Sequence, residues 1–193
     1  MLSRYSLPGF GSKRRFDDLS EREILALAIS SEEEDGQIYA AYAARLRDPY
    51  PATAKVFEDM AMVEDMHRRS LIEIYKKRFG DVILPLRREH VAGYYTRSPV
   101  WLVENLGLER VREEAADMER SAHKFYVDAA KRTTDADTRK LLGDLAIAEA
   151  GHERAVERSI ERHLDGAARG EEDAAAHRQF LLTWVQPGLA GLM

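Results

Sequence analysis

The chain has 193 residues, of which 45% are hydrophobic and 33% are charged, and its net charge is −5. This length and composition fit one soluble domain with its own core, whereas the acidic balance lacks the basic footprint of a nucleic-acid-binding protein. The absence of cysteine excludes disulfides, thiolate zinc sites, iron–sulfur clusters and cysteine nucleophiles. We therefore expect no nucleic-acid partner and no site built on thiolate ligands.

The sequence begins with a basic arm over residues 1–19, which is positively charged but lacks the apolar core of a signal peptide. Ser20 and Glu23 then have the spacing of a capping box, which marks the start of a helix. Hydrophobic residues recur at helical spacing beyond it and predict a first helix over about 20–47, which ends before two prolines. A second helix with a similar apolar stripe is predicted over about 51–80.

Residues 81–99 contain two prolines and a glycine, which predicts a long connection with at most a turn or two of helix. A third helix is predicted over about 100–132 and a fourth over about 135–166, capped by Thr134 or Asp135. The sequence shows no alternating pattern of the kind that predicts strands. Two short-linked helix pairs joined by a long crossover predict an all-α, ferritin-like four-helix bundle.

The bundle is assigned to residues 20–168, and residues 169–193 are interpreted as a helical linker with an apolar end. A shorter helix is predicted over 171–184. Residues 180–193 carry no charge, yet they are fewer than the roughly 20 residues that span a bilayer. This end is interpreted either as a docked tail or as the start of a membrane segment that continues beyond this sequence.

Polar residues interrupt the apolar stripes at matching positions in the two halves of the bundle. Each half carries a glutamate and a tyrosine seven residues apart, followed by a Glu-x-x-His pair: Glu32, Tyr39, Glu64 and His67 in the first half, and Glu119, Tyr126, Glu149 and His152 in the second. Spacings of three and seven residues place side chains on one helix face. The repeat therefore predicts a pseudo-twofold arrangement in which all eight side chains point toward the bundle axis.

Four carboxylates in one core would repel each other, and each is costly to bury without a partner. A single Glu-x-x-His on a charged helix is usually a solvated surface pair, but the repeated pattern on an apolar stripe favours a metal site. Four carboxylates and two imidazoles are the ligand set for two metal ions in a helix bundle. The ligand types suit iron or manganese; zinc would bind without a redox role, so iron is expected.

The pattern predicts three ligand roles: bridges from Glu64 and Glu149, terminal carboxylates from Glu32 and Glu119, and one imidazole for each metal from His67 and His152. Tyr39 and Tyr126 are predicted to contribute to the chemistry as hydrogen-bonding groups beside the ligands.

These residues resemble the rubrerythrin branch of the ferritin-like superfamily over roughly residues 20–165. Rubrerythrin itself carries a rubredoxin-like iron–cysteine domain, which this cysteine-free chain lacks. It also has an extra glutamate three residues after the ligand of the third helix, where this chain has Ala122. The pseudo-twofold equivalent on the first helix is Asp35, which we predict either as the extra carboxylate ligand or as a plain surface acid.

A closer resemblance, to the membrane-bound ferritin family, rests on the segment KRRFDDLSEREILALAISSEEEDGQIY, the bundle after it, and the end FLLTWVQPGLAGLM. In that family a rubrerythrin-like domain precedes a membrane domain similar to vacuolar iron transporters. The resemblance implies a cytoplasmic domain of a protein anchored in the inner membrane, whose C-terminal membrane domain is missing from this chain. It also implies that the domain binds iron and oxidises Fe(II) with O2 or H2O2, as the iron-handling or sensing module of an iron exporter.

Two alternative functions remain open at this point, within iron homeostasis and the response to oxidative stress. One is a rubrerythrin-type peroxidase with an external electron donor, and the other is a metal-sensing module without catalysis. Ferritin-like bundles with long crossovers often pair, so we expect a homodimer, in which helices could be exchanged.

Overall fold

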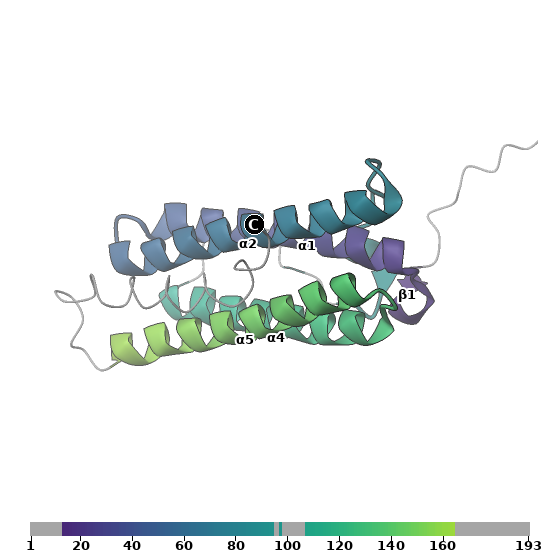
Figure 1. The fold of residues 1–193 in the computed structure, drawn as a ribbon. Helices are drawn as coiled ribbons and strands as arrows, with labels where there is room; N and C mark the ends of the chain where they lie inside the picture. Colours follow the sequence, from purple (N-terminus) through teal and green to yellow (C-terminus); the bar gives the residue numbers. More distant parts are fainter. Residues whose placement is uncertain (1–12, 95–96, 98–106, 165–193) are drawn as a thin grey trace, which may run out of the picture.

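The computed structural model describes residues 13–94, 97 and 107–164. Four long helices run side by side in two layers, with α1 and α2 in one layer and α4 and α5 in the other (Figure 1). Their bounds are Glu21–Leu46 for α1, Pro51–Phe79 for α2, Leu108–Arg132 for α4 and Ala136–Leu164 for α5. There are also two short 3-10 helices. η1 (Phe16–Asp18) precedes α1, and η2 (Arg88–His90) lies in the crossover between α2 and α4. The all-α, four-helix bundle predicted from the sequence is confirmed.

The helix ends follow the local signals in the sequence. The capping box before α1 is present, because the Ser20 hydroxyl accepts a hydrogen bond from the Glu23 amide and the Glu23 carboxylate accepts one from the Ser20 amide. Asp135 accepts a hydrogen bond from the Thr138 amide at 2.8 Å before α5. Gly80 ends α2 with a φ of 84°, a conformation that favours glycine.

The third long helix starts later than the sequence predicted. α4 begins at Leu108 rather than near residue 100, because Gly107 has an extended backbone (φ −68°, ψ 164°). Apolar periodicity alone does not locate such a break. Residues 98–106, the predicted helix over 171–184 and the apolar end over 180–193 lie outside the described residues. Among the helices that the structure describes, none is both long and apolar enough to cross a membrane.

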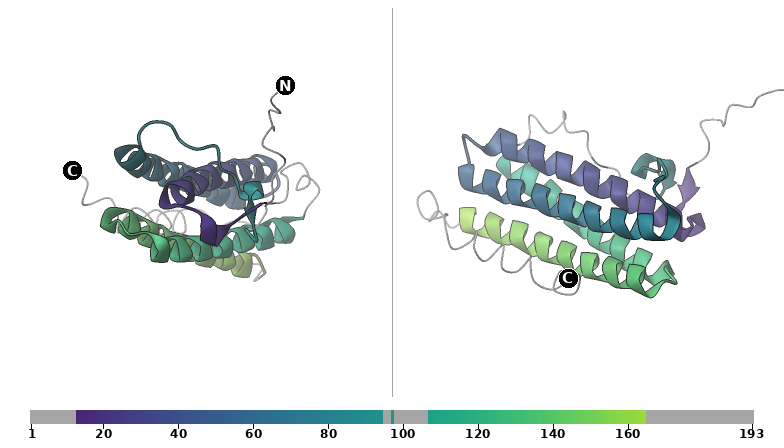
Figure 2. Two further views of the ribbon diagram at one scale, coloured as in Figure 1. Left: turned by 90° about the vertical axis from the view of Figure 1, so that its right-hand side faces the viewer. Right: turned by 45° about the horizontal axis from the view of Figure 1, so that its top comes forward.

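The end of the N-terminal arm packs against the crossover. Strand β1 (Arg14–Arg15) pairs in parallel with β2 (Val91–Ala92), a two-residue ladder that the sequence did not predict. Phe16 extends the contact, with its ring centroid 6.5 Å from that of Tyr94 and 5.8 Å from that of Phe125. The views in Figure 2 show β1 at one end of the bundle. A pair this short carries no alternating pattern, so only the packing reveals it.

Two apolar clusters fill the bundle, one toward each end. The first includes Leu25, Leu71 and Leu142, and the second includes Phe57 and Val111. Between the two clusters, each long helix contributes polar side chains to one central layer, which is composed of Glu32, Glu64, His67, Glu119, Glu149 and His152. All but His67 are buried. The fold therefore holds a polar layer between two hydrophobic ones.

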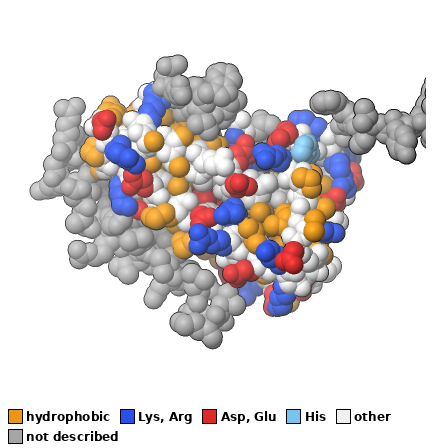
Figure 3. Space-filling model, turned by 90° about the horizontal axis from the view of Figure 1, so that it is seen from above, with side chains coloured by type: hydrophobic (Ala, Val, Ile, Leu, Met, Phe, Trp, Pro, Cys, Tyr) orange, Lys and Arg blue, Asp and Glu red, His pale blue; other side chains and the backbone are white. Residues whose placement is uncertain are grey.

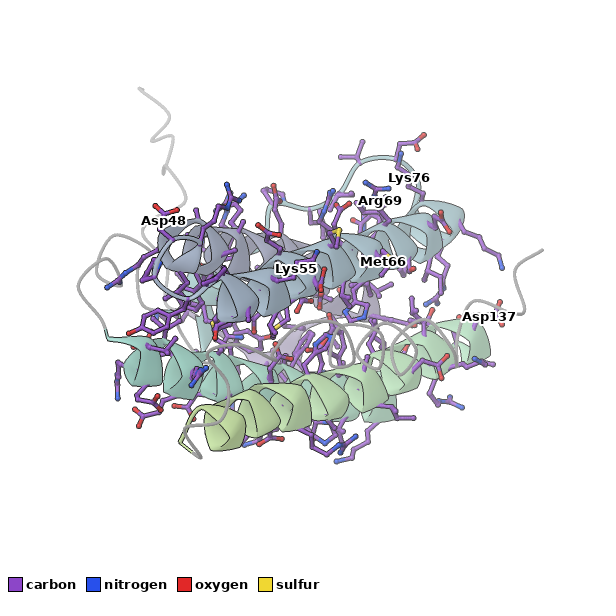
Figure 4. All side chains as sticks on the ribbon, turned by 90° about the vertical axis from the view of Figure 1, so that its left-hand side faces the viewer. Asp48, Lys55, Met66, Arg69, Lys76 and Asp137 are labelled. Atoms are coloured by element: carbon purple, nitrogen blue, oxygen red, sulfur yellow. The ribbon has the colours of Figure 1, made fainter. Side chains whose placement is uncertain are left out.

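The outer face of the bundle carries charges of both signs. In the view from above, Lys, Arg, Asp and Glu side chains alternate with smaller hydrophobic areas (Figure 3). Lys55, Arg69 and Lys76 lie along α2, together with Met66, whose side chain is also exposed (Figure 4). Since the charged residues lie outside and the apolar stripes inside, the helices are amphipathic in the sense that the sequence predicted.

The capping box leads to a simple stability test. Ser20→Ala is expected to lower the free energy of unfolding by about 1 kcal/mol, because the Glu23 amide loses its hydrogen-bond acceptor. Urea denaturation measures the change. Ser70→Ala, at an exposed position inside α2, is the matched control and should not destabilise the protein. Equal effects of the two substitutions would contradict the capping role.

Candidate metal centre

The central layer brings together all six predicted Glu and His ligands, which come from four helices: Glu32 from α1, Glu64 and His67 from α2, Glu119 from α4, and Glu149 and His152 from α5. Five of the six residues are buried, and the His67 side chain is 13% exposed. Each ligand points inward because helical spacing places it on the apolar stripe of its helix.

The six residues form two overlapping groups. One consists of Glu32, Glu64, His67 and Glu149, and the other of Glu64, Glu119, Glu149 and His152. Within each group, one ligand atom from every residue lies within 4.8 Å of the others. Glu64 and Glu149 belong to both groups, which is the arrangement that two bridging carboxylates require. Each group also has one terminal glutamate and one histidine of its own.

The first group contains three buried atoms that have no hydrogen-bond partner among the described residues: Glu32 Oε2, His67 Nδ1 and Glu149 Oε1. His67 Nδ1 lies 3.4 Å from that Glu32 oxygen and 3.3 Å from that Glu149 oxygen, so the three atoms converge. Each atom carries a lone pair when His67 is the appropriate neutral tautomer. Buried polar atoms are normally satisfied, and a bound cation would satisfy all three, so the residues present fit a metal ion.

The second group is more closed. The His152 side chain is fully buried, and its Nδ1 lies 2.9 Å from a Glu119 oxygen and 3.3 Å from a Glu149 oxygen. A metal ion bound here would replace these contacts of His152 Nδ1, whereas in the first group it would meet His67 Nδ1 and Glu32 Oε2, which have no hydrogen-bond partner among the described residues. The two halves are therefore alike in sequence but differ in access and in hydrogen bonding.

Both predicted tyrosines reach the layer, but each contacts the opposite helix pair. The Tyr126 hydroxyl on α4 donates a hydrogen bond to Glu32 on α1, and the Tyr39 hydroxyl on α1 donates one to Glu119 on α4. Spacing along one helix places Glu32 and Tyr39 on the same face, and both are buried. The structure adds a contact that spacing does not give, because each hydroxyl joins the glutamate of the other half of the bundle.

Asp35 lies outside both groups. Its carboxylate accepts hydrogen bonds from Arg88 and Arg97, including contacts of 2.9 Å and 2.8 Å. These arginines occupy both of its oxygens, so its placement gives no support to a role as an extra metal ligand. The alternative of a plain surface acid is also unsupported, because Asp35 is only 6% exposed.

Sequence reasoning missed these two arginines. Both come from the crossover, where no periodic pattern marks a buried residue, and the chain has 29 lysines and arginines among which they do not stand out. Asp35 was the only available signal, since a buried acid one turn after a ligand needs a partner.

Comparison with known proteins agrees with this geometry. The sequence model of the rubrerythrin family matches residues 23–160. The chain belongs to the rubrerythrin family. No curated protein matches it.

Two solved structures share the rubrerythrin-like fold of this chain. A hypothetical protein from Pyrococcus furiosus is 20% identical, covers 78% of this chain and 94% of its own, and superposes with a TM-score of 0.62. A structure from Thermotoga maritima, described as a ferritin-like diiron-carboxylate protein, is 19% identical and has a TM-score of 0.59. It covers 72% of this chain and 93% of its own. At these identities the likeness concerns the fold.

Burial and mutual repulsion shift the proton equilibria of the carboxylates in this rubrerythrin-family site. Burial raises the pKa of Glu119 to about 8, against the opposing charge of His152. Burial, followed by the charges of Glu149 and Glu32, raises the pKa of Glu64 well above its ordinary value. Burial likewise raises the pKa of Glu149. Without metal, the layer therefore retains protons that a cation would displace.

The remaining groups shift in both directions. Burial alone would lower the pKa of His67, but the close approach of the Glu149, Glu32 and Glu64 carboxylates raises it well above its ordinary value. Burial lowers the pKa of His152, against the opposing effect of Glu119. Burial would raise the pKa of Glu32, but its close approach to Glu64 and His67 lowers it.

These shifts predict how the metal-free protein responds to pH. A group whose pKa is higher in the folded state stabilises the fold at low pH and loses that contribution as pH rises through the folded value. Glu64, Glu119, Glu149 and His67 all act in this direction between about pH 5 and 8, and His152 opposes them. The free energy of unfolding in chelator should therefore fall across this range.

Urea titrations at several pH values measure this fall. Glu119→Gln is expected to flatten it, because glutamine cannot titrate, while Glu73→Gln at an exposed position of α2 should keep the wild-type slope. Stability that rises with pH across the range would contradict the assignment of raised pKa values.

The difference between the two groups predicts the order of metal binding. The group with Glu32 and His67 should bind first, because Glu32 Oε2 and His67 Nδ1 have no hydrogen-bond partner among the described residues and His67 is partly exposed. In the other group, Glu119 and the buried His152 Nδ1 already contact each other. In a calorimetric titration of metal-free protein with Co(II), His67→Ala should remove the tighter step. His152→Ala should keep that step and weaken the second by about tenfold or more. Loss of the tighter step in His152→Ala alone would reverse the order.

Proposed function

We propose that this rubrerythrin-family domain binds two iron ions and oxidises Fe(II). The observation that carries the proposal is the pair of overlapping carboxylate–histidine groups, which share Glu64 and Glu149 in a buried layer. The described residues of the layer present four carboxylates and two imidazoles, a donor set that suits iron or manganese and leaves zinc without a redox role. The Thermotoga maritima structure of the same fold is described as a diiron-carboxylate protein, which supports the choice of iron.

Fe(II) is the substrate in this proposal, and the electron balance is simple. Two Fe(II) ions give up one electron each. Dioxygen takes up the two electrons and two protons to form H2O2, or H2O2 takes up the same number to form two water molecules. Protons held by the layer in the metal-free state leave when the cations bind, since metal binding and protonation compete for the same oxygens.

The side chains of the protein position and shield the substrate. Tyr126 and Tyr39 hold Glu32 and Glu119 by hydrogen bonds, which fixes the orientation of each terminal carboxylate. Burial raises the pKa of both phenols well above the ordinary value, and the charge of the glutamate that accepts each hydrogen bond raises it further. They therefore remain protonated donors at neutral pH. The apolar clusters on either side of the layer keep bulk water away from it.

We further propose that the domain works on the cytoplasmic side of the inner membrane, as the iron-handling or sensing module of an iron exporter. The support is the resemblance to membrane-bound ferritins and the uncharged apolar segment over residues 180–193. In this setting the oxidation of Fe(II) would control or prepare the ion that the membrane domain moves.

A rubrerythrin-type peroxidase is the second candidate, and membership of the family favours it. Such an enzyme would consume H2O2 repeatedly and would need an external electron donor, because the chain has no cysteine for an iron–sulfur donor of its own. A module that binds iron without accelerating its oxidation would instead be a sensor.

The proposal predicts saturable binding of about two Fe(II) ions per chain in an anaerobic titration. Combined Glu64→Ala and Glu149→Ala should abolish binding of the pair, because both bridging positions are lost. Glu73→Ala, on the exposed face of α2, should bind iron as the wild type does. Failure of the wild type to bind, or undiminished binding by the double variant, would refute the site.

Addition of O2 or H2O2 to the loaded protein separates the functions. Oxidation of the bound iron faster than that of free Fe(II), with stoichiometric use of oxidant, supports the ferroxidase. Repeated turnover of H2O2 with a reductant supports the peroxidase, and bound iron that oxidises no faster supports the sensor.

A further inference from the structure

A buried cluster of charges lies beside the metal layer and outside both groups of candidate ligands. It consists of Asp35 on α1 and two crossover residues, Arg88 in η2 and Arg97. Both arginine side chains are buried, at 2% and 7% exposure. Each oxygen of Asp35 accepts a hydrogen bond from both arginines. We refer to these three residues as the Asp35 clamp.

The charges in the clamp depend on one another. Burial alone would raise the pKa of Asp35, but Arg97 and Arg88 lower it below its ordinary value, so the carboxylate is ionised at neutral pH. Bidentate contacts between arginine and a carboxylate are strong and directional. Removal of Asp35 would take away the carboxylate that two buried arginines share, which is costly. Arg88 also donates a hydrogen bond to Glu34 at 2.7 Å, so each arginine has a further contact besides Asp35.

Each arginine also contacts the backbone next to a predicted ligand. Arg88 Nη2 donates a hydrogen bond to the carbonyl of Ser31 at 3.2 Å, and Ser31 directly precedes Glu32. Arg97 Nη2 donates one to the carbonyl of Met118, also at 3.2 Å, and Met118 directly precedes Glu119. The clamp therefore joins the backbone of α1 to that of α4 at the level of the two terminal carboxylates.

This connection matters because the helix contacts lie mainly within each pair, between α1 and α2 and between α4 and α5. The spacing between α1 and α4 sets the separation of Glu32 and Glu119, and a metal site tolerates little error in such a separation. On the equivalent face of α4 the chain has Ala122 in place of an acid, so the pseudo-twofold does not repeat Asp35 there.

We propose that Asp35, Arg88 and Arg97 are positioning residues for the metal centre. By holding α1 against α4, they fix the distance between Glu32 and Glu119 and keep both groups able to bind metal. This proposal rests on the dinuclear site described above. It assigns to Asp35 a third role, the support of the ligands, beside the extra ligand and the plain surface acid that the sequence left open.

The test compares Arg97→Met with Arg78→Met in a Co(II) titration of metal-free protein, followed by calorimetry and by the visible absorption of the bound ion. Arg78 is the matched control, because it also makes a two-point contact with a glutamate, Glu21, at the end of the bundle away from the metal layer. Circular dichroism confirms that each variant is folded.

We expect Arg97→Met to bind at least one of the two Co(II) ions about tenfold more weakly, with a changed absorption spectrum. Arg78→Met should lose stability but keep wild-type affinities and spectrum. A folded Arg97→Met protein with both affinities and the spectrum of the wild type would overturn the clamp proposal alone. Failure of the wild type to bind two Co(II) ions would overturn the dinuclear site, and the clamp proposal with it.

Arg97→Lys carries the same comparison should Arg97→Met not fold. Lysine keeps the charge, but its single ammonium group lacks the planar fork that contacts Asp35 and the Met118 carbonyl together. Weaker binding or an altered spectrum in this variant would support the positioning role, and wild-type behaviour would overturn it.

Discussion

The burial of four carboxylates between two helix pairs is the constraint on which the rest of this structure depends. Glu32, Glu64, Glu119 and Glu149 are each at most 4% exposed, so water cannot stabilise their charges. Desolvation and mutual repulsion make a fully ionised, metal-free layer unfavourable. Protons or cations must supply the missing positive charge, which is why the layer holds two imidazoles and groups its carboxylates where a cation could bind.

The surrounding contacts hold this layer in place. Apolar clusters pack on both sides, while the hydroxyls of Tyr39 and Tyr126 cross between the helix pairs to the terminal glutamates. The Asp35 clamp adds a second link between α1 and α4. The six Glu and His side chains meet at the interface between the two helix pairs, and these contacts cross that interface.

The two halves of the repeat have diverged in their surroundings. His67 is partly exposed and its Nδ1 has no hydrogen-bond partner among the described residues, whereas His152 is fully buried and its Nδ1 contacts Glu119 and Glu149. The first half also has Asp35, where the equivalent position of the second half is Ala122. The two halves therefore offer a cation unequal surroundings despite their matching sequence pattern.

The sequence by itself determined the helical class, the capping box before α1, and the six Glu and His residues that the fold brings together. Helical spacing is a local property, so Glu64 and His67 had to share a face, and the repeat identified the second pair at Glu149 and His152. Only the tertiary structure decided which residues meet across the bundle. The hydrogen bonds of Tyr39 and Tyr126 across the bundle, and the pairing of Asp35 with two crossover arginines, depend on contacts between distant segments. The start of α4 at Leu108 depends on backbone conformation. No period along the chain encodes such contacts, because they arise from the packing of whole helices against one another.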